Sequence, residues 1–164
     1  MTSEEFAEFY ETHARGLRSY LRRSSGNEAL AEDLMQEAFI RLLNTESVAA
    51  ETRRAYLYRI ATNLMIDESR AKQRRLGWIR EMIWPSGIKA DDGQLRSDME
   101  RVFAKLSARE RSLLWLAYVE GWSHEEIGRT LGLGASSVKV MIHRAKLKLQ
   151  TKLREVGLAL TGAL

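Results

Sequence analysis

The feature that most constrains this fold is the scarcity of proline, because Pro85 is the only proline in 164 residues. Proline breaks helices, so only the helix structure around Pro85 can be interrupted by a proline. Leucine and alanine occur 22 and 18 times, against 14 for valine and isoleucine together, and this balance favours helix over sheet. We therefore predict an all-α fold of two small helical domains.

Several classes of protein are excluded by composition. The chain has no cysteine, which removes disulfides, cysteine zinc sites and thiol catalysis. No apolar run approaches the roughly 18 residues of a membrane span. The start of the chain carries Glu4 and Glu5, which is not the pattern of a signal peptide. These observations predict a cytoplasmic protein without membrane insertion.

Apolar residues recur at steps of three and four through the first 21 residues, which predicts an amphipathic helix. Gly26 would end it, and Asn27 is a good N-cap for a second helix over about 28–43. A polar loop over 44–52 then leads to a third helix over about 53–72. His13 lies within the first apolar stripe and is expected to pack rather than to bind a metal.

Turn-forming residues gather over 77–97, which we predict to be a linker between domains spanning 1–76 and 98–164. Within it, Trp78 and Met82 could form a helical turn. Its apolar face would pack on the chain's own domains or on an outside partner, and the role of Trp84 is left open.

The C-terminal part has the spacing of a helix-turn-helix. Two capping boxes, Ser107 with Glu110 and Ser123 with Glu126, mark helix starts. Gly121 would end the helix that begins at the first box. The second begins a short helix over about 124–131, and a glycine-containing turn joins it to a long helix over about 135–153. A plain three-helix bundle is the alternative.

Charge is distributed unevenly along the chain. Residues 1–51 carry ten acids and five bases, residues 52–164 carry twelve acids and 21 bases, and 129–154 has seven bases and no acid. The long helix would bury an apolar face of Val138, Ile142, Ala145 and Leu149. Its opposite half carries Lys139, Val140, His143, Arg144, Lys146, Leu147 and Lys148. Such a basic half-face suits the major groove of DNA, although it could also be merely solvated.

Two earlier helices also present distinctive faces. On the helix over 28–43, the outward side chains are a mixed polar and aliphatic set suited to a protein partner: Asp33, Gln36, Glu37 and Ile40. On the helix over 53–72, one outer strip carries Tyr56, Arg59, Asn63 and Arg70, with Asp67 at its margin. A tyrosine, an amide and two arginines can hold phosphate and capture an unstacked base.

Both halves of the chain contain recognisable motifs. The C-terminal half has LSARER at 106–111, YVEGWSHEEIG at 118–128, VK at 138–139 and HRA at 143–145. The N-terminal half has AEDLMQEAF at 31–39 and YLYRIATN at 56–63. Together these motifs closely resemble bacterial sigma factors of the sigma-70 family, most nearly the extracytoplasmic-function (ECF) type.

The resemblance implies a role for each surface. The chain would bind RNA polymerase core through the clamp of the largest subunit, using Asp33, Gln36, Glu37, Phe39 and Ile40. It would bind the minus-ten element, including the melted non-template strand, through Arg53, Arg54, Tyr56, Arg59, Ile60, Asn63, Asp67 and Arg70. It would read the minus-thirty-five element of duplex promoter DNA with Ser136, Ser137, Lys139, Val140, His143, Arg144, Lys146 and Lys148. An anti-sigma factor is a further implied partner.

Three positions depart from the family pattern. Asp67 stands where some relatives have an amide, so the minus-ten base preference cannot be transferred. Val140 and Met141 replace a serine or arginine found in many relatives, and Gly134 replaces an N-cap serine.

No catalytic, cofactor or metal site is expected. His124-Glu125 lacks the second histidine of a zinc-hydrolase helix, and no glycine-rich phosphate loop is present. The competing hypothesis is a helix-turn-helix repressor or activator whose N-terminal helices dimerise. It would leave the Asp33 and Asn63 surfaces without a role.

Overall fold

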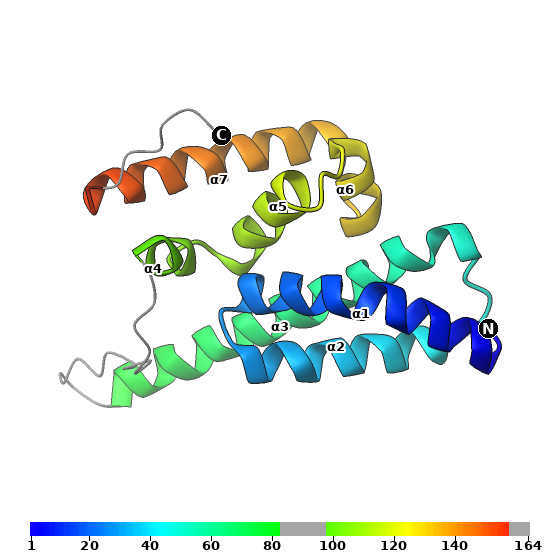
Figure 1. The fold of residues 1–164 in the computed structure, drawn as a ribbon. Coiled ribbons are helices and arrows are strands. Elements are labelled where there is room, and N and C mark those ends of the chain that lie inside the picture. The colour runs from blue at the N-terminus through cyan, green and yellow to red at the C-terminus, as the bar shows by residue number, and fades with distance from the viewer. Residues whose placement is uncertain (83–97, 158–164) are drawn as a thin grey trace.

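The computed structural model describes residues 1–82 and 98–157, and side-chain positions throughout these except at 78–82 and 98. Within those ranges the chain is helical and contains no strand, which confirms the all-α prediction. Two groups of helices form two layers (Figure 1). The first layer is α1 to α3 and the second is α4 to α7.

The first layer is a three-helix bundle of α1 (Ser3–Ser25), α2 (Glu28–Leu43) and α3 (Arg53–Met82), with a short 3-10 turn, η1 (Ala50–Thr52), before α3. Gly26 adopts a left-handed conformation with φ of 70° and ends α1. Asn27 caps α2 by accepting from the Leu30 N–H. The predicted bounds of α2, residues 28–43, are confirmed. The predicted polar loop over 44–52 contains the short 3-10 helix η1, which was not predicted.

The third helix is longer than predicted. It continues past 72 and crosses the proposed 76/77 domain boundary before reaching Met82. The turn-forming residues that suggested an earlier end include Gly77, which a helix interior tolerates at a cost of about 1 kcal/mol. The helical turn expected at Trp78 and Met82 is part of α3, whereas Trp84 and Pro85 lie outside the described residues.

The second layer comprises α4 (Asp98–Ala104), α5 (Ala108–Tyr118), α6 (His124–Leu131) and α7 (Ala135–Glu155). Both predicted capping boxes are present, since the Ser107 and Ser123 hydroxyls accept from the N–H groups of Glu110 and Glu126. The expectation that α5 runs to Gly121 was wrong by three residues. Helix α5 ends at Tyr118 with Val119 as its C-cap, and Gly121, with φ of 69°, belongs to the following turn.

The two layers are packed against one another. In Figure 1, α5 and α6 lie between α7 and the first layer. Helix α5 contacts α1 and α3, and α6 contacts α3. The buried apolar residues form a core that extends through both layers, from Leu17 and Leu57 to Ile127 and Val138. The outer face of α7 is therefore directed away from α1 to α3.

Candidate nucleic-acid and protein interfaces

The turn between α6 and α7 is set by two glycines. Gly132 has a φ of 70° and ends α6, a conformation that residues with side chains rarely adopt. Gly128 lies within α6 and packs against the turn, and a Cβ built on it would be 2.5 Å from the Leu133 carbonyl oxygen. The Leu133 N–H donates to the Gly128 carbonyl at 2.8 Å. This close approach of the Gly128 and Leu133 backbones sets the orientation of α7 relative to α6.

Helix α7 buries the face predicted from its sequence. Val138, Ile142, Ala145 and Leu149 are all buried, and Leu153 extends the same stripe. The side chains of the opposite face that are exposed are those of Ser136, Ser137, Lys139, Val140, His143, Arg144, Leu147 and Lys148. Val140 is 47% exposed, as its angle from Val138 predicted, while Lys146 is partly buried. The helix thus presents a basic surface with apolar positions on it.

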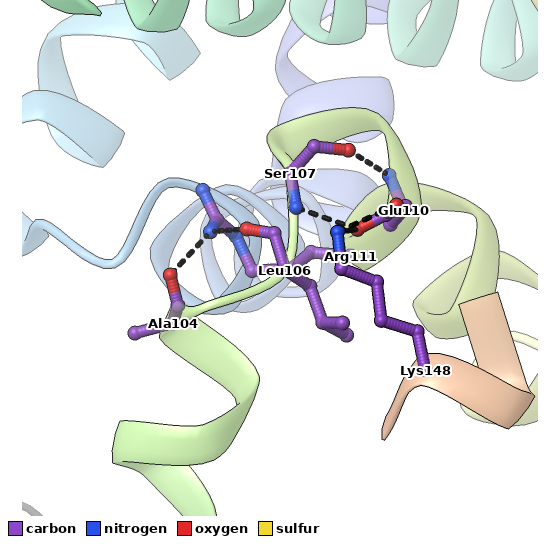
Figure 2. Close-up of polar contacts among 6 residues, drawn as sticks. All are labelled: Ala104, Leu106, Ser107, Glu110, Arg111 and Lys148. Atoms are coloured by element: carbon purple, nitrogen blue, oxygen red, sulfur yellow. Dashed lines mark hydrogen bonds and ion pairs between the residues drawn. The ribbon is translucent and has the colours of Figure 1, made fainter. Parts of the chain in front are cut away.

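One lysine of α7 has a partner within its own domain (Figure 2). The Lys148 Nζ lies 3.1 Å from both carboxylate oxygens of Glu110. Burial raises the pKa of Glu110, but hydrogen bonds from the Ser107 N–H and from Lys148 outweigh it, so the pKa is lowered. The Glu110 carboxylate therefore takes part in the cap of α5 and also holds α7 against α5.

The outward face of α2 is a mixed surface. Asp33 and Gln36 are exposed, and Ile40 is 51% exposed. Leu43 is 47% exposed and lies within about 60° of Ile40 around the helix. Leu43 was not predicted from the sequence, although its spacing of three from Ile40 is the signal that indicates it. Exposed aliphatic side chains next to an amide and a carboxylate are suited to contact with another protein.

Two residues predicted for this surface have other contacts. Phe39 is only 3% exposed and packs against Phe6, Phe9 and Tyr10. The prediction that Phe39 contacts a partner is corrected, because α1 covers it. Glu37 is partly exposed, and its carboxylate accepts from the Arg41 Nε at 2.7 Å.

Along α3, most of the predicted strip remains together. Arg59, Asn63, Asp67 and Arg70 are exposed, whereas Tyr56 and Ile60 are partly buried. Asn63 and Arg70 are seven residues apart and so share one side of the helix. The strip therefore offers an amide, a carboxylate and guanidinium groups to solvent.

The two arginines at the start of α3 are not part of that strip. Arg53 donates from Nε to the Val48 carbonyl at 3.3 Å, and its Nη2 lies 3.9 Å from a Glu5 carboxylate oxygen. Arg54 is nine residues before Asn63, which places it about 180° around the helix. Its Nη2 lies 3.3 Å from Glu120 Oε2, in the second layer.

An aromatic and hydroxyl cluster lies beneath Arg54. The Tyr58 ring centroid is 5.0 Å from that of Trp122 and 5.3 Å from that of Tyr20. The Tyr20 hydroxyl lies 2.7 Å from the Thr62 Oγ1. Burial raises the pKa of Tyr20 to about 12, although hydrogen bonding to Ser112 and Thr62 opposes the shift. These tyrosines are therefore neutral structural groups at ordinary pH.

His13 is packed, as expected, with its ring centroid 4.4 Å from that of Phe9. Partial burial, and then the charge of Arg54, lower its pKa. Across residues 1–82 and 98–157 no group of three or more metal-binding side chains comes together. No helix in those same ranges has the length and apolarity needed to cross a membrane.

Comparison with known proteins identifies relatives for both layers. The family model for sigma-70 region 2 matches residues 9–75, and that for sigma-70 region 4 matches residues 96–149. The chain is 32% identical over 156 residues to the ECF RNA polymerase sigma factor SigL of Mycobacterium tuberculosis, which covers 90% of this chain and 88% of SigL. It is 31% identical over 170 residues to the ECF RNA polymerase sigma factor SigW of Bacillus subtilis, which covers 93% and 91%.

A solved structure shares the fold. The sigma factor RpoE of Bartonella quintana, solved in complex with the anti-sigma factor NepR, superposes with a TM-score of 0.68. The match covers 92% of this chain and 98% of that chain, at 21% sequence identity.

Proposed function

The chain belongs to the sigma-70 family as an ECF RNA polymerase sigma factor, and we propose that it directs the polymerase core to promoters through three separate surfaces. The observation that carries this proposal is the match of two regions, in order, to two helical layers that each present an exposed face. A helix-turn-helix repressor or activator that dimerises through the first layer would leave the exposed surfaces around Asp33 and Asn63 without a role.

The polymerase surface is the outward face of α2. Asp33, Gln36, Ile40 and Leu43 are exposed there, and Phe39 packs beneath them against α1. An apolar centre with polar neighbours is the composition of a protein interface rather than of a phosphate contact. We assign this surface to the clamp of the largest polymerase subunit.

The minus-ten surface is the exposed strip of α3. Strand opening requires a site that captures a base once it leaves the stack. Asn63 supplies an amide for such a base edge, while Arg59 and Arg70 on the same side can bind the flanking phosphates. The side chains of Tyr56 and Ile60 are partly buried. We therefore assign them to packing beneath the strip rather than to direct contact with DNA.

The minus-thirty-five surface is the outer face of α7. Arg144 carries the forked guanidinium that pairs with guanine, and Val140 offers methyl groups to a thymine methyl. Lys139 and Lys146 supply contacts to the phosphate backbone, as does Lys148 when it leaves Glu110. Ser136, Ser137 and His143 complete the exposed set.

This function requires no chemistry by the chain itself. We propose that it is not an enzyme, needs no cofactor, and acts in the cytoplasm, where polymerase and chromosome lie. An anti-sigma factor is a further proposed partner, since the structural relative from Bartonella quintana was solved with one.

The experiment is reconstitution with bacterial core RNA polymerase. Purified chain and core are mixed and separated by size, and the complex then transcribes fragmented genomic DNA of the source bacterium. We expect co-elution and discrete transcript starts that core alone does not produce. A chain that elutes as a free homodimer and yields no new starts would support the repressor or activator alternative instead.

A further inference from the structure

One exposed face of α1 carries its acids and its bases in two separate blocks. The acids lie in the first half of the helix and the bases in the second half. At about 100° per residue, the six side chains lie within about 80° of one another, and the row is about 27 Å long. We call this face the charged stripe, and its exposed members are Glu4, Glu8, Glu11, Arg15, Arg18 and Arg22.

This order of charges does little for α1 itself. Within each block, neighbours three or four residues apart have the same charge, which destabilises an isolated helix. The helix macrodipole favours acids at the N-terminus and bases at the C-terminus, but it acts only over the first and last turns. It therefore accounts for Glu4 and Arg22, which lie in those turns. It does not account for Glu8, Glu11 and Arg15 between them.

Most of the charged stripe has no ionic partner in its own chain. Five members form no ion pair with any other residue within the part of the chain that the structure describes: Glu4, Glu8, Glu11, Arg15 and Arg22. Arg18 is the exception, because its Nε lies 3.0 Å from Glu32 Oε2 on α2, yet its side chain is still 53% exposed. The charges of the stripe are therefore available to another molecule.

The spacing of the charged stripe is symmetrical about position 13. Positions 4 and 22, positions 8 and 18, and positions 11 and 15 each have their midpoint there. A second α1 laid antiparallel, with position 13 opposite position 13, would place every acid of one helix opposite a base of the other. The two-fold axis of such an arrangement forms each of these three kinds of pair twice.

The surroundings of the charged stripe allow two helices to approach one another. Ala7 and Thr12 lie on its two flanks, and both are exposed and small. Antiparallel helices also place the positive end of one macrodipole beside the negative end of the other. Exposed ion pairs are individually weak and are screened by salt. Association through this face would therefore be weak and sensitive to ionic strength.

We propose that α1 of one chain pairs antiparallel with α1 of a second copy through the charged stripe. The partner that fits must present three bases and three acids at the same spacing in reverse order, and a second copy of this chain does so. The pairing is a property of the free chain, so it is independent of how the polymerase-bound chain selects promoters in the function proposed above. It differs from the dimer of a repressor because it dissociates as salt is raised.

The test uses the full-length chain and two variants with the net charge of the parent. Glu11→Arg combined with Arg15→Glu exchanges one pair and keeps every acid opposite a base. Glu4→Arg combined with Arg15→Glu is the matched control, because it places like charges opposite one another in two of the three kinds of pair. Both variants leave Arg18 and its ion pair with Glu32 unchanged. Sedimentation equilibrium at about 50 mM and about 500 mM salt measures association. Circular dichroism establishes that each variant is folded.

At low salt we expect the parent and the exchanged variant to dimerise with affinities within about twofold of one another, and the mismatched control to dimerise at least about tenfold more weakly. High salt should weaken the parent dimer by about tenfold or more, because it screens exposed ion pairs.

A parent chain that stays monomeric at low salt would overturn the pairing, as would a dimer that is indifferent to salt. Equal association of the two variants would overturn the antiparallel register. Loss of affinity for core polymerase in both variants, with a monomeric parent, would assign the charged stripe to the polymerase instead. Transcript starts of the parent chain test the proposed function separately from all of these outcomes.

Discussion

The Lys148 Nζ lies 3.1 Å from both carboxylate oxygens of Glu110, so the long helix α7 is tied to the first turn of α5. Glu110 also accepts from the Ser107 N–H in the capping box (Figure 2). One carboxylate thus joins a local cap to a contact between helices 38 residues apart in sequence.

This contact predicts a pH-dependent stability. The folded-state pKa of Glu110 lies below its ordinary value of 4.5, so its stabilisation is present above about pH 4.5 and is lost as pH falls through the folded pKa. Glu110→Gln should cost about 0.5–1 kcal/mol at pH 7, because the pair is partly exposed. Urea unfolding of parent and variant should show this difference shrink below pH 4.5. A difference that stays constant with pH would contradict the ionic contribution.

Gly128→Ala should destabilise the helix-turn-helix by about 1–3 kcal/mol, because the new Cβ would meet the Leu133 carbonyl oxygen. Gly77→Ala is the matched control, since it is also helical and its Cβ meets nothing within 4 Å. The control should stabilise α3 by about 0.5–1 kcal/mol through helix propensity. Denaturant midpoints measure both changes. Equal effects of the two substitutions would show that the close approach at Gly128 is unimportant.

Gln36→Ala combined with Glu37→Ala should weaken binding to core polymerase while helix content is unchanged, because both side chains lie at the α2 surface. Adding Leu43→Ala should weaken it further by removing an exposed apolar contact. Binding is measured by fluorescence anisotropy of labelled chain. The control pair is Glu46→Ala with Gln73→Ala, at exposed positions outside α2. Affinity as high as that of the control pair would remove the case for a polymerase surface on α2.

Asn63→Ala should reduce promoter opening more than closed-complex formation, because the amide is assigned to a base that becomes available only after unstacking. Permanganate reactivity of minus-ten thymines reports opening, and gel shift at low temperature reports the closed complex. Arg22→Ala, at an exposed position in α1, is the control and should alter neither. Reactivity equal to that of the parent would contradict the role of Asn63.

Arg144→Ala should cost about 1–3 kcal/mol at one base position of the minus-thirty-five element, since a forked guanidinium reads a single guanine. Lys139→Ala should instead weaken all sequences alike and lower the salt dependence by about one unit of slope. Lys148→Ala should do the same, with an added loss of stability from its bond to Glu110. Binding to a panel of singly mutated promoters at several salt concentrations separates these effects. Uniform weakening by Arg144→Ala would make Arg144 a phosphate contact.

The sequence alone predicted the helices of both layers, apart from the ends of α3 and α5, and the exposure of much of each proposed surface. The capping boxes at Ser107 and Ser123 were found at their predicted positions, and the buried stripe of α7 followed from its 3.6-residue period. The outward placement of Val140 followed from the same period. These features depend on residues within a few positions of one another, which is the range over which caps and helical periodicity act.

For two residues, the contacts of the side chain could be seen only in the tertiary structure. Phe39 has the type and position of a surface contact in its motif, yet three aromatic side chains of α1 bury it. Arg54 appears in sequence as one more basic residue at the start of the helix proposed to bind DNA, yet it donates a hydrogen bond to Glu120, 66 residues away. Periodicity shows which faces of a helix are apolar, but a charged residue that pairs with another domain leaves no such pattern. The sequence by itself therefore determined the helices and their caps, while the packing of one layer on the other decided which side chains remain free to bind, because that depends on contacts between residues distant along the chain.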